Sequence, residues 1–462
     1  MIKTIAALLA LGTFSACSLI PDYLRPAAPV AQVYPADATG KDTRSAAETS
    51  WREFFPDPGL QALIQAAIAN NRDLRMAALR IDEARALYNI QSADLYPNIN
   101  AGFTGNRAHT PASLSTTGQQ MTASAYQVGF SLASFEIDYL GRVRSLNQAA
   151  LSLYLATDEA RQSAQISLIA EVAKAALAER AFAEQQDLAQ RTLDGREAAY
   201  KLSKQRFDVG ATSALDLRSN ETLVLNARVA LAVLARQRAQ AINALTLLTG
   251  RPLAGLPAVQ MLAAQGIVSE LPAGLPSDLL TRRPDIRAAE ERLKASNANI
   301  GAARAAFFPR ISLTAGFGTA SNALSGLFDS GSGAWSFAPQ LLQPIFDAGR
   351  NRANLTLTEV RKDLAVADYE KTVQVAFREV ADALVARSLL DQQIDAQQAV
   401  QVAQADLLRL SEQRYRNGVA SYLEVLIAER DLFLAEQSLV QARLLRLTNA
   451  IDLYRSLGGG LI

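Results

Sequence analysis

Most of this chain has the residue spacing and composition of very long helices. Residues 142–207 are rich in Ala, Leu, Gln and Arg and contain almost no Gly or Pro, and these residue types have high helix propensity. At 1.5 Å per residue, a helix of roughly 65 residues extends about 100 Å. A second helical pattern, at about 213–248, follows a short turn that contains Gly210. The sequence therefore predicts an elongated helical hairpin rather than a compact globular domain.

Four short segments alternate with a period of two instead. Such alternation, apolar on one face and small or polar on the other, is typical of transmembrane β-barrel strands, although a half-buried strand of a soluble sheet would show it too. Because the four occur as a set in an otherwise helical chain, we interpret them as barrel strands near 98–138 and 310–346. The alternating sequences are NINAGF, YQVGFSLA, ISLTAGFGTA and the segment that Trp335 and Phe337 open.

Four strands are too few to close a barrel. Open sheet edges are not tolerated in lipid, because each unpaired backbone group there lacks any hydrogen-bond partner. The sequence therefore predicts that several copies of the chain contribute to one barrel, and two to four copies would supply about 8 to 16 strands.

The same order of patterns occurs twice along the chain. The sequence RFDVGATSALDL at 206–217 returns as RYRNGVASYLEV at 414–425, 208 positions later, and Tyr96-Pro97 returns as Phe308-Pro309, 212 positions later. The offset changes by four between these places, and loops tolerate such length differences best. We therefore predict a duplicated unit. The expected parts are a signal peptide (1–16), a lipidated extended segment (17–59), a first repeat (60–250), a connector (251–271), a second repeat (272–459) and a C-terminal end (460–462).

The N-terminus has the features of an export signal. An apolar run from Ile5 to Phe14 follows Lys3 and precedes small residues, and this run is too short to span a membrane as a helix. The sequence FSAC, ending at Cys17, resembles a bacterial lipobox, whose cysteine is lipidated. A buried structural cysteine is the alternative interpretation. Because Cys17 is the only cysteine, disulfides are not expected.

Composition argues against an enzyme or a nucleic-acid-binding protein. Without residues 1–16 the chain has 45 basic and 45 acidic residues, which gives no electrostatic attraction to nucleic acid. The one histidine, His109, lies in a Ser/Thr/Gly-rich stretch that we predict to be a surface loop, with no second histidine or nearby thiol for a zinc site or catalytic pair. No phosphate-binding loop motif is present. No metal or cofactor is expected beyond the covalent lipid on Cys17.

The two copies of the duplicated turn sequence have the features of helix ends. Gly210 and Gly418 suit the left-handed position that ends a helix, and Ser213 and Ser421 suit the N-cap of the next helix. An acid follows each serine by three residues, Asp216 and Glu424 respectively, which is the spacing of a capping box. Helix-end stabilisation, worth about 1 kcal/mol or less for each acid, is one interpretation of these carboxylates.

Several longer stretches resemble the TolC-like outer-membrane efflux channels, in particular the lipoprotein branch that serves resistance-nodulation-division multidrug pumps. The resemblance covers essentially the whole chain. It implies a homotrimer with a 12-stranded outer-membrane barrel, four strands from each chain, continued by a periplasmic α-helical barrel. It also implies passive conduction of drugs and amphipathic compounds, with an inner-membrane proton-driven pump and a periplasmic adaptor as partners. The stretches are CSLIPDY, SWREFFPDPGLQALI, NNRDLR, FEIDYLGRVRS, LPAGLPSDLLTRRPDIRAAE, ANIGAARAAFFPRISLTAGFG and YRSLGGGL.

The resemblance also assigns roles to the turn sequences. Leu423 and Glu424 match positions that line the periplasmic gate of the family, and Asp216 is the corresponding acid of the first repeat. Ile427 stands where related channels have an aspartate, so the gate is expected to be less charged here. The two turns themselves match contacts to the adaptor, although a tight turn alone would explain their glycines. These turn residues are Val209, Gly210 and Ala211, and Asn417, Gly418 and Val419.

Two other functions stay open at this point. The outer-membrane duct of a type I protein-secretion system would share the general architecture, but the quoted stretches and the lipobox favour the efflux branch. A periplasmic coiled-coil structural lipoprotein would explain the helices, but it would leave the four alternating segments without a role.

Overall fold

The computed structural model describes residues 18–31, 34, 48–116, 118–255, 257–268, 271 and 276–461. Cys17 and the predicted signal peptide lie outside the described residues. The chain divides into two compact units. The first unit consists of the N-terminal stretch up to Ala27 with Arg80–Thr157 and Ala288–Tyr369; the second consists of Ala28–Leu79, Asp158–Arg287 and Glu370–Ile462.

The first unit contains one antiparallel sheet of four strands. Its strands are β1 (Ile99–Thr110), β2 (Met121–Glu136), β3 (Arg310–Ser321) and β4 (Gly333–Leu342), and neighbours in the chain are neighbours in the sheet, in the order β1-β2-β3-β4. His109, predicted to lie in a loop, is the penultimate residue of β1, where its Nδ1 lies 2.9 Å from Thr122 Oγ1. That prediction is wrong because β1 extends further into the polar stretch than the apolar alternation does.

The strand register confirms the predicted difference between the two faces of the sheet. Ala101, Phe130, Phe317 and Trp335 form one cross-strand row. The adjacent row consists of Asn100, Ser131, Gly316 and Ser336. Because successive side chains point to opposite faces, one face is apolar and the other is small and polar. Phe130, Phe317, Trp335 and Phe337 are all exposed.

Four helices have one end next to the sheet in the first unit and continue along the chain into the second. Helix α4 (Arg72–Ala93) precedes β1, and α8 (Pro284–Ala305) precedes β3. Two very long helices, α5 (Arg142–Asp208) and α9 (Arg350–Arg416), follow β2 and β4. Asp347 caps α9, because its carboxylate accepts hydrogen bonds from the backbone N–H groups of Gly349 and Asn351 and so satisfies donors that a helix start leaves free.

An extended N-terminal strap, residues 18–25, lies along α8. Arg25 donates two hydrogen bonds to the Glu290 carboxylate, at 2.9 and 2.8 Å, and the Tyr23 hydroxyl donates a third at 3.1 Å. The Asn297 amide donates to Pro21 O at 2.7 Å. Ile20 packs against an alanine cluster that includes Ala295 and Ala298 and lies next to Gly301, where a Cβ would collide with it. The strap therefore covers one stripe of α8.

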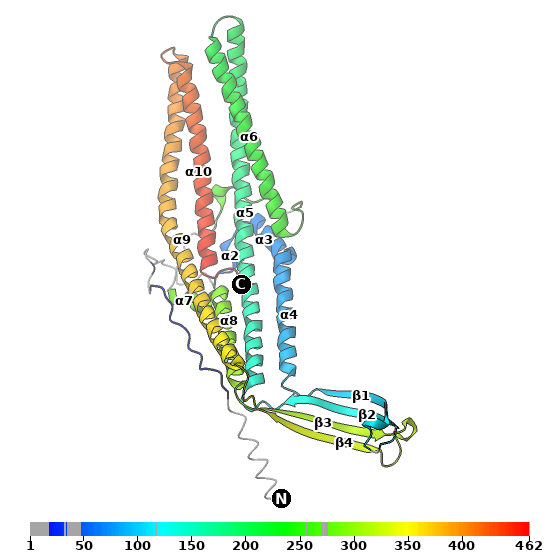
Figure 1. Ribbon diagram of the computed structural model, residues 1–462. Coiled ribbons are helices and arrows are strands. Elements are labelled where there is room, and N and C mark those ends of the chain that lie inside the picture. The colour runs from blue at the N-terminus through cyan, green and yellow to red at the C-terminus, as the bar shows by residue number, and fades with distance from the viewer. Residues whose placement is uncertain are drawn as a thin grey trace. The chain divides into compact units, whose positions relative to one another are not determined.

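The second unit holds two helical hairpins. Helix α6 (Ala214–Thr249) returns along the C-terminal part of α5, and α10 (Tyr422–Ser456) returns along that of α9 (Figure 1). Shorter helices complete the unit: α2 (Trp51–Phe54), α3 (Pro58–Asn70) and α7 (Pro276–Arg282). Among the described residues, no helix has both the length and the continuous apolar character needed to cross a membrane.

An aromatic cluster fixes the C-terminal end of α10. The rings of Phe54 and Tyr454 stack with centroids 4.0 Å apart, and Phe55 meets Tyr454 edge to face at 6.2 Å. All three side chains are fully buried. The Tyr454 hydroxyl donates to Thr49 O at 2.7 Å, which satisfies the one polar atom of that ring. The end of α10 is thereby held against α2.

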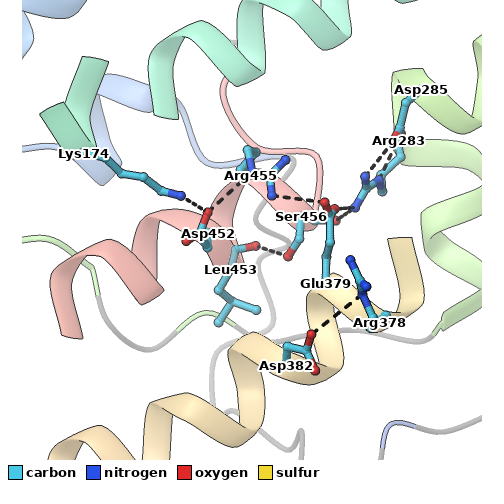
Figure 2. A network of polar contacts seen from close by, with 10 residues as sticks. All are labelled: Lys174, Arg283, Asp285, Arg378, Glu379, Asp382, Asp452, Leu453, Arg455 and Ser456. Carbon is cyan, nitrogen blue, oxygen red and sulfur yellow. Dashed lines mark hydrogen bonds and ion pairs between the residues drawn. The ribbon is translucent and has the colours of Figure 1, made fainter. Parts of the chain in front are cut away.

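A polar network at the base of the hairpins, where α10 ends, joins four helices, α5, α8, α9 and α10 (Figure 2). Buried Arg283, at the α7–α8 junction, binds Asp285 with two hydrogen bonds and reaches Glu379 of α9 at 2.8 Å. Its guanidinium also donates to Ser456 O at the end of α10. Arg455 bridges Glu379 and Asp452, and Lys174 of α5 pairs with Asp452. Positive and negative groups therefore alternate from α8 to α5.

Matching contacts occur at the ends of α6 and α10. The Asn71 amide donates to Leu248 O at 2.9 Å, as Arg283 donates to Ser456 O at 3.0 Å. Both helices then end in a glycine with positive φ, Gly250 and Gly458. A Cβ on Gly250 would collide with the Asn70 carbonyl, and one on Gly458 would lie 3.0 Å from the Arg282 carbonyl oxygen. The positions that make these contacts are separated by the offsets of 212 and 208 seen in the sequence.

Short 3-10 turns complete the described part. They are Ala112–Leu114 between β1 and β2, Leu324–Gly326 between β3 and β4, and Leu262–Ala264 in the segment after α6. The last of these is held where Leu262 N donates to the Glu184 carboxylate at 2.7 Å. This segment lies within the predicted connector.

Candidate gate and adaptor-binding tips

The first hairpin tip has the capping geometry that its sequence predicts. Gly210 has φ +74°, in the left-handed region, and Ser213 Oγ accepts a hydrogen bond from Asp216 N at 3.1 Å. The Asp216 carboxylate in turn accepts from the hydroxyls of Ser213 (2.7 Å) and Thr212 (3.1 Å). These hydrogen bonds, the one from Ser213 above all, hold the pKa of Asp216 below its ordinary value.

The second tip differs from this pattern. Gly418 has φ +70° as expected, but the Ser421 side chain makes no capping hydrogen bond. The Glu424 carboxylate lies 3.1 Å from the Arg414 guanidinium in the last turn of α9. The predicted capping box is therefore wrong at this tip. The physical reason is that glutamate is one methylene longer than aspartate and reaches across the hairpin to a cation.

Apolar side chains are exposed at both tips. On α10, Leu423 is 59% exposed and Ile427, one turn later, is 41% exposed. Residues four apart share a helix face, so the two form one apolar stripe that is open to a neighbouring surface. Val209 and Val419 in the turns are also exposed. Such groups at the end of a hairpin offer dispersion and apolar contact to another chain.

A contact between the two hairpins lies beside the tips, and sequence reasoning missed it. The Arg206 guanidinium donates to the Tyr415 hydroxyl at 2.9 Å, and the Tyr415 ring lies 5.0 Å from the ring of Tyr422. Burial raises the pKa of Tyr422 to about 12. The signal was available in the duplicated sequence, because Phe207 is replaced by Tyr415 at the matching position and only the tyrosine can accept this hydrogen bond.

Further along the hairpins, the buried Arg196 of α5 lies beside the Phe433 ring of α10. Arg196 is 7% exposed, donates to Leu223 O at 3.2 Å and lies 5.8 Å from the Phe433 ring. Burial lowers its pKa, and the nearby Glu429 charge partly opposes that shift. The pKa of Glu429 is raised, mainly by burial. Glu429 lies 208 positions after Glu221, the offset of the repeated turn sequence, but no local pattern reveals which helix it faces.

Comparison with known proteins shows which protein family has this architecture. A family profile described as outer membrane efflux protein matches residues 63–251 and again 275–459. The outer membrane protein OprJ of Pseudomonas aeruginosa is 47% identical over 458 residues, which cover 99% of this chain and 95% of the relative. The probable efflux pump outer membrane protein TtgC of Pseudomonas putida is 47% identical over 453 residues, with coverage of 96% and 93%.

Solved structures agree with this assignment. A membrane protein from Pseudomonas aeruginosa superposes with a TM-score of 0.91 at 46% identity, covering 96% of this chain and 100% of that chain. The open state of the Neisseria gonorrhoeae MtrE outer membrane channel superposes with a TM-score of 0.89 at 43% identity, covering 96% and 99%. Long helical hairpins combined with one amphipathic four-stranded sheet thus define a class of outer-membrane channels. The chain belongs to the outer membrane efflux protein family, and it is an outer-membrane component of an efflux system.

Proposed function

We propose that this protein is the outer-membrane exit duct of a tripartite multidrug efflux system. It conducts drugs and other amphipathic compounds passively and performs no chemistry, while an inner-membrane proton-driven pump supplies the energy. The observation that carries the proposal is the sheet with one exposed apolar face on a chain of long helical hairpins. Relatives of similar length are named for the efflux of antibiotics, solvents and toluene.

A trimer completes the membrane part. In the described sheet the outer edges of β1 and β4 have no neighbouring strand, and lipid does not tolerate such edges. Pairing β1 of one copy with β4 of the next closes a barrel, and three copies give 12 strands in the family's architecture. The apolar face would then meet lipid and the polar face would enclose water.

Each chain would contribute two structural repeats to the periplasmic tube. Supporting this, the Asn71–Leu248 and Arg283–Ser456 contacts recur with the sequence offsets, and each half of the chain contains helix, two strands, long helix and returning helix in that order. Two repeats in each of three chains place six hairpin tips around the mouth of the tube.

These tips would form the gate and bind the periplasmic adaptor. The exposed Leu423 and Ile427 stripe suits an apolar constriction, and Glu424, held by Arg414, adds a compensated charge beside it. The Asp216 carboxylate accepts hydrogen bonds from Thr212 and from Ser213, the N-cap of α6, so its part in the gate would be to keep the first tip in shape. The adaptor would contact Val209, Gly210 and Ala211 on the first tip and Asn417, Gly418 and Val419 on the second. Cys17 would carry the covalent lipid that anchors the N-terminus in the outer membrane.

Drug accumulation tests this function. In cells that lack the gene but retain the cognate pump and adaptor, accumulation of a neutral antibiotic should rise and should return to normal with the wild-type chain. A Gly210→Glu, Gly418→Glu double variant should not restore export, because both residues have positive φ and bulky charges at the turns disturb the surface that meets the adaptor. Unchanged accumulation after deletion would contradict the proposed function, and full export by the double variant would contradict the adaptor assignment.

A further inference from the structure

We propose that the first unit contains a binding station for organic anions, resting on the function proposed above, where the polar face of the sheet meets the helices. A cavity of about 400 Å³ lies among α5, α8, α9 and the start of β3. Three arginines line it, Arg142, Arg310 and Arg361, and its lining contains no carboxylate. Its other polar groups are neutral: Ser296, Asn299, Asn354 and Thr358.

The charges at this cavity do not cancel. The Glu136 carboxylate accepts two hydrogen bonds from Arg142, at 2.8 and 2.7 Å, and lies 3.4 Å from Arg310. One carboxylate therefore pairs with two guanidinium groups. Arg361 is exposed, and no described side chain forms an ion pair with it within 4.0 Å. Among the ion pairs within 4.0 Å, the Arg142 and Arg310 guanidinium groups share one carboxylate, while Asp138 and Asp94 act on Arg142 from farther away. The direct contacts therefore leave positive charge in excess, which favours an anionic ligand.

One residue of the cavity lining, Arg310, belongs to the polar face of the sheet. Alternate residues of a strand share a face, so Arg310 lies on the face of Ser312 and Thr314, opposite the face of Ile311 and Phe317. Since the polar face would enclose the water-filled barrel, a solute that leaves through the duct would pass this cavity.

The geometry of α8 places the cavity away from the N-terminal strap. The strap contacts Glu290, Asn297 and Gly301. At about 100° per residue, Asn299 of the cavity lies roughly opposite the centre of that stripe. The strap and the cavity therefore occupy different sides of one helix, and the strap leaves the cavity open.

The lining also selects the shape of the ligand. Ala302, Ala303 and Ala306 form one wall, and Leu146 of α5 contributes to another. Arginine binds carboxylates and sulfonate-like oxygens through its fork of N–H donors, whereas alanine methyl groups offer apolar contact. An aromatic or aliphatic body with one carboxylate or sulfonate group fits both features. The station would retain such amphipathic anions briefly during export.

Calorimetric titration of the detergent-purified full-length protein with 1-naphthalenesulfonate tests the site directly. The wild type should bind this anion saturably and should bind the neutral 1-naphthalenemethanol far more weakly. Arg361→Gln should weaken sulfonate binding at least about tenfold, the usual size for one charge-assisted hydrogen bond, while Arg361→Lys should lose less. The matched control is Arg304→Gln, which removes an arginine charge from α8 outside the cavity lining. This variant should bind the sulfonate as the wild type does.

Three results would overturn the inference: no saturable sulfonate binding to the wild type, unchanged binding by Arg361→Gln, or an equal loss in Arg304→Gln. Export assays separate this site from the proposed function. Arg361→Gln should slow export of an anionic drug and leave export of a neutral drug unchanged. If deletion of the gene affects no drug while sulfonate binding still depends on Arg361, the proposed duct fails and the binding site stands; if export depends on the chain but not on Arg361, the station fails alone.

Discussion

At the scale of single residues, two turns with nearly the same sequence use different interactions. Asp216 accepts hydrogen bonds from Ser213 and Thr212 within its own tip. Glu424, at the matching position, forms an ion pair with Arg414 across its hairpin. The glycine positions and the Ser213 cap follow from local sequence, because they depend on neighbours along the chain. The partner of Glu424 does not, because it depends on which side chain the returning helix faces.

The two caps should therefore respond differently to the same change. Ser213→Ala should destabilise the first turn of α6 by about 1 kcal/mol, which corresponds to roughly fivefold faster amide exchange there. Ser421→Ala should change exchange in the first turn of α10 very little, because Ser421 makes no capping hydrogen bond. Hydrogen–deuterium exchange of the two purified variants gives the comparison. Equal acceleration at both tips would contradict this difference.

The pH dependence of stability should reveal the burial of Glu429. Its pKa is raised in the folded protein, by burial first and with Arg196 opposing the shift. The folded state then binds the Glu429 proton more tightly than the unfolded state. Ionisation of Glu429 therefore lowers the free energy of unfolding. This loss is absent below the ordinary pKa of glutamate and complete once the pH exceeds the pKa of Glu429 in the folded protein. Glu429→Gln should therefore raise the thermal unfolding midpoint at pH 8 and leave it nearly unchanged at pH 4. If Glu429→Gln raised the unfolding midpoint, relative to the wild type, more at pH 4 than at pH 8, the pKa of Glu429 would not be raised in the folded protein.

At the scale of elements, periodicity in the sequence predicts most of the architecture. Expected helices at 142–207 and 213–248 correspond closely to α5 (Arg142–Asp208) and α6 (Ala214–Thr249). The strands are longer than the apolar alternation alone indicates, because backbone pairing in β1 and β2 continues into polar residues. The network around Arg283 could not be predicted, since its partners come from α9 and α10, distant in sequence.

Loss of Arg283 should destabilise the base of the hairpins strongly. Arg283→Ala removes the buried cation that pairs with Asp285 and Glu379, and breaking a buried ion pair typically costs about 3–5 kcal/mol; Glu379 keeps its contact with Arg455. The matched control is Arg378→Ala, which breaks the exposed Arg378–Asp382 pair in the same view (Figure 2) and should cost about 0–1 kcal/mol. Urea unfolding followed by circular dichroism compares the two variants. Similar losses would show that the network around Arg283 is no stronger than a surface pair.

At the scale of the whole molecule, the chain would have two separate membrane attachments, a lipid on Cys17 and a closed barrel. Cys17→Ser should therefore stop lipidation but leave much of the protein in the outer-membrane fraction, because the barrel is an independent anchor. Membrane fractionation with carbonate washing measures what remains. Complete release into the soluble fraction would show that the sheet does not form a barrel.

Conductance across a planar lipid bilayer tests the central claim, a membrane-spanning duct that is closed at the hairpin tips. Purified wild-type protein should insert and conduct ions weakly. Replacing Leu423 and Glu424 together with Ala removes the exposed apolar side chain and the Arg414 ion pair, so conductance should increase several-fold. No conductance by either protein would contradict a duct, and equal conductance by both would contradict a gate at these residues.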